Sequence, residues 1–468
     1  MQGGLNMFYK NKLRLGVLPI KRSYLSLEMA AAEKEKMFST VSSLKSESVT
    51  LIDIDDICKK GIAYREEDID PVIEKFKRER IDAIFLMHCD FGEEEIAVKV
   101  IRSFQLPVLL WGPRDQRPNK PGRYGRDTQC GMFADSKVLL RNHITFSYVY
   151  NVETDSDEFK EGYINFLRTA TIVRDLKNLR IAQIGQRPRQ FMSVIASEAA
   201  LMEKFGIEVV PISAHDIISK TISLADSKDT FVSESVLQMK NKMDCSSMQD
   251  DQLRRIAALK KVVLGKMEET GCRSGAIECW SLFPDAIGVP PCMVVSEFAD
   301  IGIPLACETD LNGALTSVIA QSVGLNEQPI FFADLTIRNP QNDDSELLWH
   351  CGPFPYSLKD NACRARMVEG QATWQLKKGD ITILRCDELM GKYYLTATEG
   401  KAVDGPSTTG SYVWFQTKDW KEMEETFIYG PYIHHVAGIY GKYRRAIEEV
   451  TRYLPIKWDQ PGNYPKSL

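Results

Sequence analysis

Short apolar runs separated by helix-like segments dominate the first two thirds of this sequence. In the first series, the strand-like runs are residues 13–20, 49–54, 81–87 and 107–111. Amphipathic patterns with helical spacing lie between them, at 26–44 and 68–80. Buried strand-sized runs that alternate with helices indicate a parallel, doubly wound sheet with helices on its faces.

A second series of the same kind begins at residue 179. Its strand-like runs are residues 179–185, 207–212, 276–280, 292–296 and 303–307. A long helical pattern covers 251–270, whereas the polar segment 226–247 gives no firm assignment. This series predicts a second Rossmann-like domain with its own sheet.

The pattern changes after about residue 339. Strand-like segments at 374–377, 380–385 and 392–398 follow one another with Gly and Asp turns, and a helix is expected over 438–454. Such spacing is typical of an antiparallel sheet or small barrel. The chain of 468 residues is also too long for one core. We therefore expect two doubly wound Rossmann-like α/β domains, 1–170 and 171–340, followed by a β-rich, barrel-like C-terminal domain, 341–468.

Composition excludes several classes of partner. A net charge of −5 gives no reason to expect nucleic acid or an anionic membrane surface. No apolar run approaches the roughly 20 residues that span a bilayer, and the N-terminus lacks the apolar core of a signal peptide. The eleven cysteines form no C-x-x-C pair, which suits buried free thiols in a reducing compartment. We expect a cytoplasmic protein.

Acidic residues follow two apolar runs in the second series. Glu308 and Asp310 lie in CETDLNGALT after residues 303–307, and Asp334 follows residues 329–333. In open α/β sheets, ligands bind beyond the carboxyl ends of the strands. Each acid alone has a structural explanation, such as an N-cap at Asp310. Two such acids in succession, Glu308 and Asp334, favour a shared site.

The six histidines add a second kind of ligand. Three lie in the last third: His350 in LLWHCGPFP, and His434 and His435 in PYIHHVAGIYG. A lone histidine is more often structural, but a doubled one before a glycine-containing run is harder to explain in that way. Carboxylates with imidazoles and no clustered cysteine suit a hard or borderline divalent ion such as Mn²⁺, Mg²⁺ or Co²⁺.

Other segments give weaker signals. The run Gln186-Arg-Pro-Arg189 offers basic groups to a phosphate or a sugar, but no phosphate-binding glycine motif accompanies it. Trp280, Trp349 and Tyr432 can stack on a sugar ring, although aromatic residues at strand ends commonly belong to the core.

Three segments resemble the metal-site segments of the L-fucose isomerase and L-arabinose isomerase superfamily. The first segment, CETDLNGALT, is similar to T-E-N-D-S-L-N-G of L-fucose isomerases. The Glu of that family segment binds the metal, which implies that Glu308 is a metal ligand. FFADLTIRN resembles F-A-D-V-R, whose Asp matches Asp334. HHVAGIYG resembles the third family segment, in which a metal-binding His precedes a G-A-x-x-Y-G-like run. His435 matches this His best, and His434 is the alternative. His350 falls where arabinose isomerases place a further His.

The resemblance implies an aldose–ketose isomerase that uses Mn²⁺ and an ene-diol intermediate. Glu308 and Asp334 would be both metal ligands and acid/base groups, and His350 and His435 would complete the coordination or bind substrate oxygens. The candidates for substrate binding are His434, Trp280, Trp349 and Tyr432. The first segment lacks one residue after Asp310, and His434 replaces a family Asn. These departures leave the sugar more open than the metal site.

The resemblance also implies a small-molecule sugar substrate and a homo-oligomer, a trimer or hexamer. Two alternatives remain from the sequence. One is a non-catalytic sugar-binding or regulatory protein, which would bind no divalent ion tightly. The other keeps the metal site but catalyses epimerisation or aldol cleavage through the same enediolate, and only the product distinguishes it from an isomerase.

Overall fold

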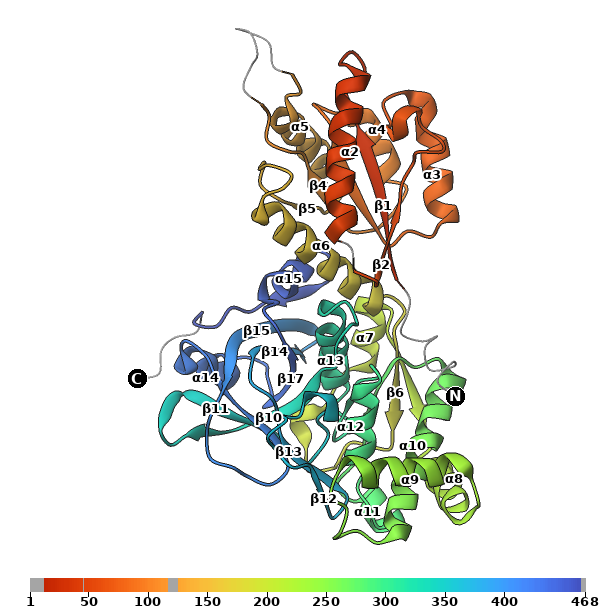
Figure 1. Ribbon diagram of the computed structural model, residues 1–468, viewed down its shortest axis with the longest axis vertical. Helices are drawn as coiled ribbons and strands as arrows, with labels where there is room; N and C mark the ends of the chain where they lie inside the picture. The colour runs from red at the N-terminus through yellow and green to blue at the C-terminus, as the bar shows by residue number, and fades with distance from the viewer. Residues whose placement is uncertain (1–11, 45, 117–124, 464–468) are drawn as a thin grey trace. The chain divides into compact units, whose positions relative to one another are not determined.

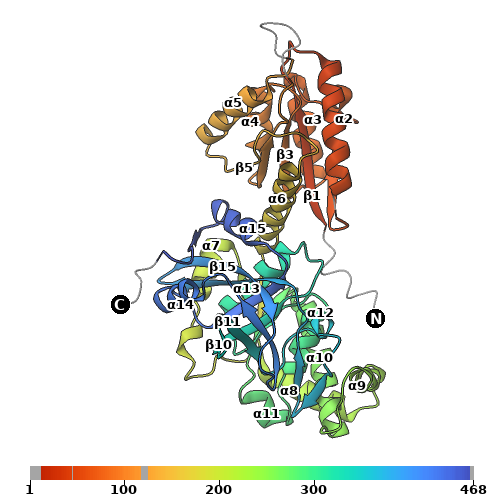
Figure 2. The same cartoon turned by 60° about the vertical axis from the view of Figure 1, so that its left-hand side comes forward.

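The computed structural model describes residues 12–44, 46–116 and 125–463 (Figures 1 and 2). The chain divides into two compact units, residues 10–174 and residues 175–468. Within the described residues, no helix has both the length and the apolar character needed to cross a membrane. The division of the second unit near residue 340 stays a prediction.

The first unit is built on a five-stranded parallel sheet of order β2-β1-β3-β4-β5. Its strands are β1 Leu13–Ile20, β2 Val49–Ile52, β3 Ala83–His88, β4 Val108–Trp111 and β5 Ser147–Tyr148. Its helices are α2 Leu27–Leu44, α3 Ile69–Arg78, α4 Glu94–Ile101, α5 Thr128–Arg141 and α6 Asp157–Leu176. All residues of β3 and β4 are buried, as expected of strands covered on both faces.

The second unit opens with a four-stranded parallel sheet of order β7-β6-β8-β9. The strands are β6 Arg180–Ile184, β7 Glu208–Ile212, β8 Ser274–Ile277 and β9 Leu305–Ala306. The helices are α7 Glu198–Phe205, α8 Ala214–Asp226, α9 Thr230–Lys242, α10 Asp250–Thr270, α11 Leu282–Ile287, α12 Cys292–Asp300 and α13 Leu311–Val323. The unassigned segment 226–247 contains the end of α8 and all of α9.

The strand predicted at 292–296 is wrong, because these residues begin α12. The first eight residues of this helix are all buried, and a short run that is apolar throughout fits a buried strand and a buried helix equally well. Pro290 and Pro291 precede the run, and proline is well tolerated where a helix begins.

The remaining strands form a nine-stranded, mainly antiparallel sheet of order β12-β13-β16-β11-β10-β17-β14-β15-β18. They are β10 Phe331–Asn339, β11 Asn342–His350, β12 Arg366–Val368, β13 Gln371–Gln375, β14 Asp380–Leu389, β15 Lys392–Val403, β16 Ser411–Gln416, β17 His435–Tyr440 and β18 Ile456–Trp458. Because β15 also pairs with β16, the strands from β16 through β10 to β15 close into a barrel. The predicted fold class is confirmed.

Two sequence predictions fail in this sheet. The helix expected over 438–454 is instead β17, followed by the short α15 Arg444–Glu449, because residues 435–439 are buried between β10 and β14. Asp334 does not follow the end of a parallel strand. It lies inside β10, whose neighbours β11 and β17 are antiparallel to it.

Helix α13 joins the two sheets of the second unit. All of its residues are buried, and it packs against β8 and β9 of the parallel sheet and against β14 and β17 of the barrel. A helix that is buried all round belongs to the core. Its N-cap is Asp310, whose side chain accepts a hydrogen bond from Gly313 N. The acidic segment before α13 is therefore fixed beside the barrel.

Candidate active site

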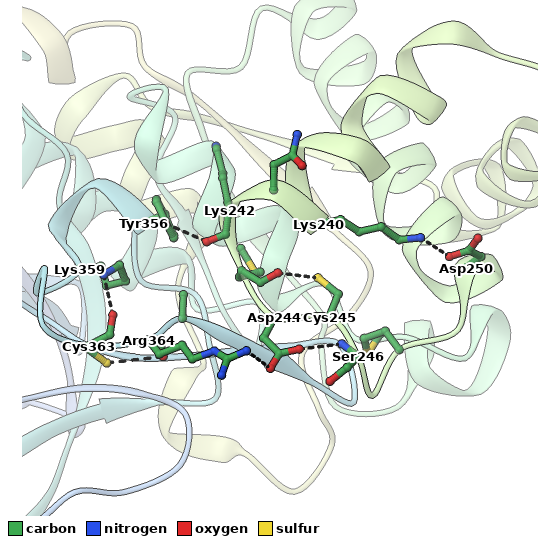
Figure 3. Close-up of a pocket in the computed structure, with 14 residues that line it drawn as sticks. Lys240, Lys242, Asp244, Cys245, Ser246, Asp250, Tyr356, Lys359, Cys363 and Arg364 are labelled. Carbon is green, nitrogen blue, oxygen red and sulfur yellow. Dashed lines mark hydrogen bonds and ion pairs between the residues drawn. The ribbon is translucent and has the colours of Figure 1, made fainter.

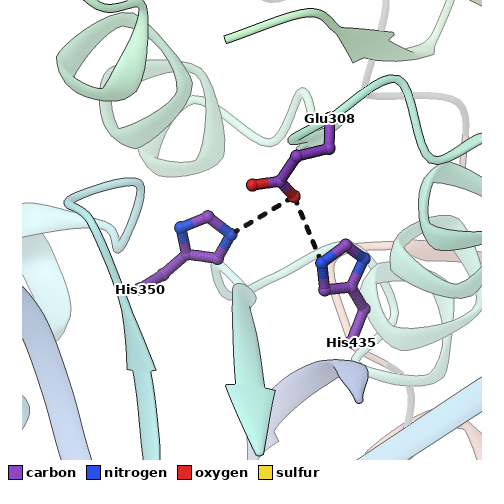
Figure 4. Close-up of side chains that lie close together, drawn as sticks. All are labelled: Glu308, His350 and His435. Carbon is purple, nitrogen blue, oxygen red and sulfur yellow. Dashed lines mark ion pairs between the residues drawn. The ribbon is translucent and has the colours of Figure 1, made fainter. Parts of the chain in front are cut away.

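Four of the predicted metal-site side chains meet in the second unit. Glu308 comes from the loop after β9, Asp334 from β10, His350 from the end of β11 and His435 from the start of β17. His435 Nε2 lies 3.1 Å from Glu308 Oε2 and 3.4 Å from Asp334 Oδ1. His350 Nε2 lies 3.8 Å from each of the same two oxygens. Figure 4 shows Glu308 pointing between the two imidazoles.

Strand pairing places Asp334 beside His435. The two residues are direct partners in the antiparallel pairing of β10 with β17. Residues that face each other in this way have neighbouring side chains on one face of the sheet. The register of the barrel therefore brings one carboxylate and one imidazole together without any loop.

An unusual backbone turn directs Glu308 into the site. Glu308 and Thr309 both adopt left-handed conformations, with φ of 53° and 56°. Such values are rare for residues other than glycine and costly for a β-branched residue, so the surroundings must enforce them. Thr309 N donates to Ile277 O (3.2 Å), and Thr309 Oγ1 donates to Gln186 O (3.2 Å). The turn is thus tied to β8 and to the loop after β6.

The donor set fits a divalent cation. Glu308 Oε2, Asp334 Oδ1 and His350 Nε2 are buried and make no hydrogen bond within the part of the chain that the structure describes. Buried polar atoms are normally paired, so three unpaired ones that face each other require an explanation. Ligand atoms that share one ion at about 2.1 Å lie about 3 Å apart when they are at right angles. His435 Nε2 lies 3.1 and 3.4 Å from the two carboxylate oxygens, close to that value, whereas His350 Nε2 lies 3.8 Å from both.

The charges of the four groups depend on one another. Burial opposes ionisation of Glu308, but His435 and His350 overcome it and lower the pKa of Glu308 to about 2. Burial also opposes protonation of His435, but Asp310 and Glu308 raise its pKa to about 9. The pKa of His350 is raised by Asp334 in spite of burial. A bound cation would take the place of these protons, as metal ions do at imidazole ligands.

Behind His435 lies a buried charged network that the sequence did not reveal. His435 Nδ1 lies 2.9 Å from Asp310 Oδ2, and Arg385 Nη1 lies 2.6 Å from the same oxygen. Arg385 Nε donates to Asp387 Oδ2 at 2.9 Å. Asp310 caps α13, as expected, but it also orients an imidazole of the site. The only signal of Arg385 in the sequence is a charged residue within the apolar run 381–386.

Aromatic rings line one side of the site. The ring of Phe191 stacks on those of Trp280 (centroids 5.4 Å apart, 15°) and His434 (5.9 Å, 17°). Trp280 Nε1 donates to Glu308 Oε1 at 3.0 Å, and Trp280 remains 47% exposed. His434 Nε2 is 4.0 Å from Asp334 Oδ1. Trp280 and His434, predicted to bind substrate, therefore border the carboxylates, and Phe191 joins them although nothing in the sequence singled it out.

The other two aromatic candidates have different contacts. Trp349 packs with a small cluster of Leu347, Tyr412 and Trp414, and its Nε1 donates to Thr409 O. The Tyr432 ring packs against Phe427, and its hydroxyl lies 3.2 Å from Asp459 Oδ2. Trp349 is also the direct partner of Asp334 in the pairing of β10 with β11, and its ring stacks beside that of His350 (centroids 6.3 Å apart, 3°). These contacts of Tyr432 involve neither Glu308 nor Asp334.

A separate surface pocket of about 710 Å³ lies between α9 and the segment 356–365 (Figure 3). Its charged side chains largely pair with one another, for example Lys240 with Asp250 (2.6 Å) and Arg364 with Asp244 (2.9 Å). None of the predicted site residues lines this pocket.

Comparison with known proteins places the chain in a family. Residues 16–177 match the fucose/sulfoquinovose isomerase N-terminal domain, and residues 359–460 match the L-fucose isomerase C-terminal domain. The chain belongs to the L-fucose isomerase-like superfamily, which confirms the resemblance seen in three short segments. It is accordingly an enzyme of the aldose–ketose isomerase class.

Individual relatives are similar along most of the chain. Sulfoquinovose isomerases from Priestia aryabhattai and Priestia megaterium are each 22% identical over 449 residues, which cover 94% of this chain and 97% of theirs. A sulfoquinovose isomerase from Alkalicoccus urumqiensis is 24% identical over 69% of this chain and 73% of its own. A solved ABC transporter solute-binding protein from Bacillus halodurans overlaps 67% of this chain and 90% of its own at 15% identity, but its TM-score of 0.16 supports no conclusion.

Proposed function

We propose that this protein is a divalent-cation-dependent aldose–ketose isomerase that acts through an ene-diol intermediate. The observation that carries the proposal is the convergence of Glu308, Asp334, His350 and His435, with three buried polar atoms left without hydrogen bonds. Membership of the aldose–ketose isomerase class argues against the alternative of a non-catalytic sugar-binding protein.

The cation would be held by Glu308, Asp334 and imidazole nitrogen, and we propose Mn²⁺, with Mg²⁺ or Co²⁺ as alternatives. These oxygen and nitrogen donors suit hard or borderline ions. In such a site a divalent cation supplies Lewis-acid stabilisation of the negative charge that develops on neighbouring sugar oxygens.

The two carboxylates provide the proton transfer. Isomerisation of an aldose moves one proton from C2 to C1 and a second proton from the C2 hydroxyl to the carbonyl oxygen on C1, and the ene-diol lies between these steps. One of Glu308 and Asp334 acts as the base and the other as the acid. Glu308 is kept ionised by its neighbours, and the side chain of Asp334 is 18% exposed.

The aromatic side of the site would bind and orient the sugar. Phe191 and Trp280 offer flat apolar surfaces beside the carboxylates, and the apolar C–H face of a sugar ring packs on such surfaces. The indole N–H of Trp280 fixes Glu308 from the same side. This arrangement would hold C1 and C2 over the two carboxylates and keep bulk water from that face.

We propose a sulfonated aldose such as sulfoquinovose as the substrate, because the relatives that match 94% of the chain are sulfoquinovose isomerases. The loop after β6 could provide the cation that a sulfonate needs. Arg187 Nη1 donates to Pro188 O (2.8 Å), Arg189 O (3.1 Å) and Phe191 O (2.9 Å), which fixes the loop. Arg189 is exposed on this loop, two residues from Phe191.

We further propose a homo-oligomer in the cytoplasm. All eleven cysteines lie within the described residues and are free thiols, as suits a reducing compartment. The oligomer rests on the family resemblance alone, and the mass of the protein in solution, by light scattering, would test it.

The proposed function is tested by product analysis. The protein, stripped of metal with a chelator, is incubated with sulfoquinovose or L-fucose, with and without Mn²⁺. We expect the corresponding ketose only when Mn²⁺ is present. Epimeric aldoses or shorter fragments would instead indicate the alternative reactions.

A pair of arginine variants tests the substrate. Arg189→Gln should raise the KM for sulfoquinovose about tenfold, the loss of roughly one charged hydrogen bond, without changing that for a neutral sugar. Arg364→Gln, at an exposed arginine in the pocket of Figure 3, is the matched control. Equal KM values for Arg189→Gln and the control would exclude Arg189 from sulfonate binding.

A further inference from the structure

The two buried histidines of the site have different hydrogen-bond partners at Nδ1. His350 and His435 are 2% and 1% exposed, and each directs Nε2 toward Glu308 and Asp334. In a neutral imidazole one nitrogen carries the hydrogen and the other carries the lone pair. The partner of Nδ1 therefore decides whether Nε2 can bind a cation.

In the neutral form that a cation requires, His435 has its lone pair on Nε2. The partner of its Nδ1 is Asp310 Oδ2 at 2.9 Å, and an ionised carboxylate only accepts hydrogen bonds. The same carboxylate accepts hydrogen bonds from the Arg385 guanidinium and from Gly313 N, so both of its oxygens act as acceptors. Nδ1 must then carry the hydrogen, and the free lone pair of Nε2 faces the two carboxylate oxygens. A carboxylate behind a histidine is the usual support of a metal-binding imidazole.

His350 has the opposite arrangement. Its Nδ1 accepts the backbone N–H of Cys351 at 2.9 Å, and a backbone N–H can only donate. The Cys351 sulfur lies 3.2 Å from the same nitrogen and 3.3 Å from the Cys292 sulfur. The lone pair of His350 is therefore used at Nδ1, and Nε2 carries a hydrogen.

We propose that the site holds its two imidazoles in opposite tautomers, so that His435 binds the cation whereas His350 donates a hydrogen bond to a sugar oxygen. This inference rests on the proposed function and deepens it. The distances agree, since His435 Nε2 is 3.1 and 3.4 Å from the two carboxylates and His350 Nε2 is 3.8 Å from both. At 3.8 Å the N–H of His350 does not reach either carboxylate, and it is left for the substrate.

The structure assigns Asp310 as a positioning residue for the same reason. It touches neither carboxylate of the proton transfer, but it fixes the tautomer and the orientation of His435. In Asp310→Asn, the side-chain amide can donate to Nδ1 and so move the hydrogen of His435 to Nε2. The result expected is a loss of metal affinity of about 10- to 100-fold.

The test counts imidazoles on the metal. Full-length wild-type protein is loaded with Mn²⁺, and the ¹⁴N couplings are measured by pulsed electron paramagnetic resonance. One coordinated imidazole supports the inference, and two overturn it. If the wild-type protein binds no Mn²⁺, both the inference and the metal dependence of the proposed function fail; two imidazoles overturn the inference alone.

Three matched variants assign the coordinated nitrogen. His435→Gln should remove the nitrogen coupling and weaken Mn²⁺ binding, measured by titration calorimetry, by at least about 10- to 100-fold. His350→Gln, which keeps a side-chain N–H donor, should leave both unchanged and instead raise the KM for the sugar. His434→Gln controls for the neighbouring imidazole and should also leave the coupling intact. Loss of Mn²⁺ affinity in His350→Gln equal to that in His435→Gln would overturn the assignment.

Discussion

Asp334 and His435 face each other across β10 and β17, with Asp334 Oδ1 3.4 Å from His435 Nε2. One carboxylate and one imidazole of the site are thus positioned by the register of a buried antiparallel pair. Glu308 reaches them from the loop after β9 of the parallel sheet, through a left-handed turn. The site therefore requires both sheets of the second unit.

Asp334→Asn should abolish most of the activity while the fold survives. The amide preserves the shape and the strand pairing, but it cannot transfer a proton, and such groups contribute about 10²- to 10⁴-fold to the rate. The measurement is kcat on the preferred aldose with saturating Mn²⁺. Asp404→Asn, an exposed carboxylate paired with Lys378, is the control and should retain full activity. Similar kcat values for the two variants would exclude Asp334 from catalysis.

Trp280→Phe isolates the hydrogen bond from the indole to Glu308. Phenylalanine keeps an aromatic ring against Phe191 but loses the N–H that reaches Glu308 Oε1 at 3.0 Å. A hydrogen bond to a charged group contributes about 1.5–3 kcal/mol, so kcat/KM should fall by about 10- to 100-fold. Trp280→Ala should in addition raise KM, because the stacking surface is lost. An unchanged kcat/KM in Trp280→Phe would show that the indole N–H does not serve the reaction.

Gly438→Ala should destabilise the barrel beside the site. A Cβ at this position would meet the ring of Phe331, the pairing partner of Gly438, at 2.1 Å. Overpacking of this kind costs about 1–3 kcal/mol. Gly265→Ala is the matched control, because nothing lies within 4 Å of that Cβ. In the exposed middle of α10, alanine should instead stabilise by about 0.5–1 kcal/mol. Urea unfolding measures the change in the free energy of unfolding for each variant, which should be a decrease for Gly438→Ala and an increase for Gly265→Ala. A change of the same sign in both variants would contradict the packing at β17.

Glu346 should make stability depend on pH. Burial, with a smaller contribution from Glu424, raises the pKa of Glu346 from 4.5 to about 7 although Arg338 opposes the shift. Between these values the folded protein holds a proton that the unfolded chain releases, so the free energy of unfolding falls as pH rises. Glu346→Gln should remove this contribution and gain stability relative to wild type as pH rises from about 5 to about 7. A constant difference between the two proteins over this range would contradict the shift.

The architecture could be predicted because its signals are local. Buried parallel strands appear as continuous apolar runs, and the runs that became β1, β3 and β6 were recognisable from hydrophobicity and spacing. The run 292–296 was misassigned because short apolar segments do not distinguish strand from helix. The helix predicted over 438–454 was wrong for a tertiary reason, because β17 forms as a strand by pairing with β10 and β14.

The candidate site was recognisable in part. Glu308, Asp334, His350 and His435 stand in short segments similar to those of a known family, and the structure brings them together. Only a local role for Asp310, as a helix cap, could be predicted, because its contact with His435 joins positions far apart in the chain. Arg385 and Phe191 were missed for the same reason: neither has a neighbour in sequence that indicates its partner.

Proton transfer in heavy water tests the central claim most directly. The Mn²⁺-loaded protein is incubated with sulfoquinovose in D₂O, and the products are followed by nuclear magnetic resonance. We expect the corresponding ketose with deuterium at C1, because the carboxylate that returns the proton exchanges with solvent, and no ketose from Glu308→Gln. A ketose free of deuterium, or a Glu308→Gln variant as active as the wild type, would contradict proton transfer by the carboxylates at this site.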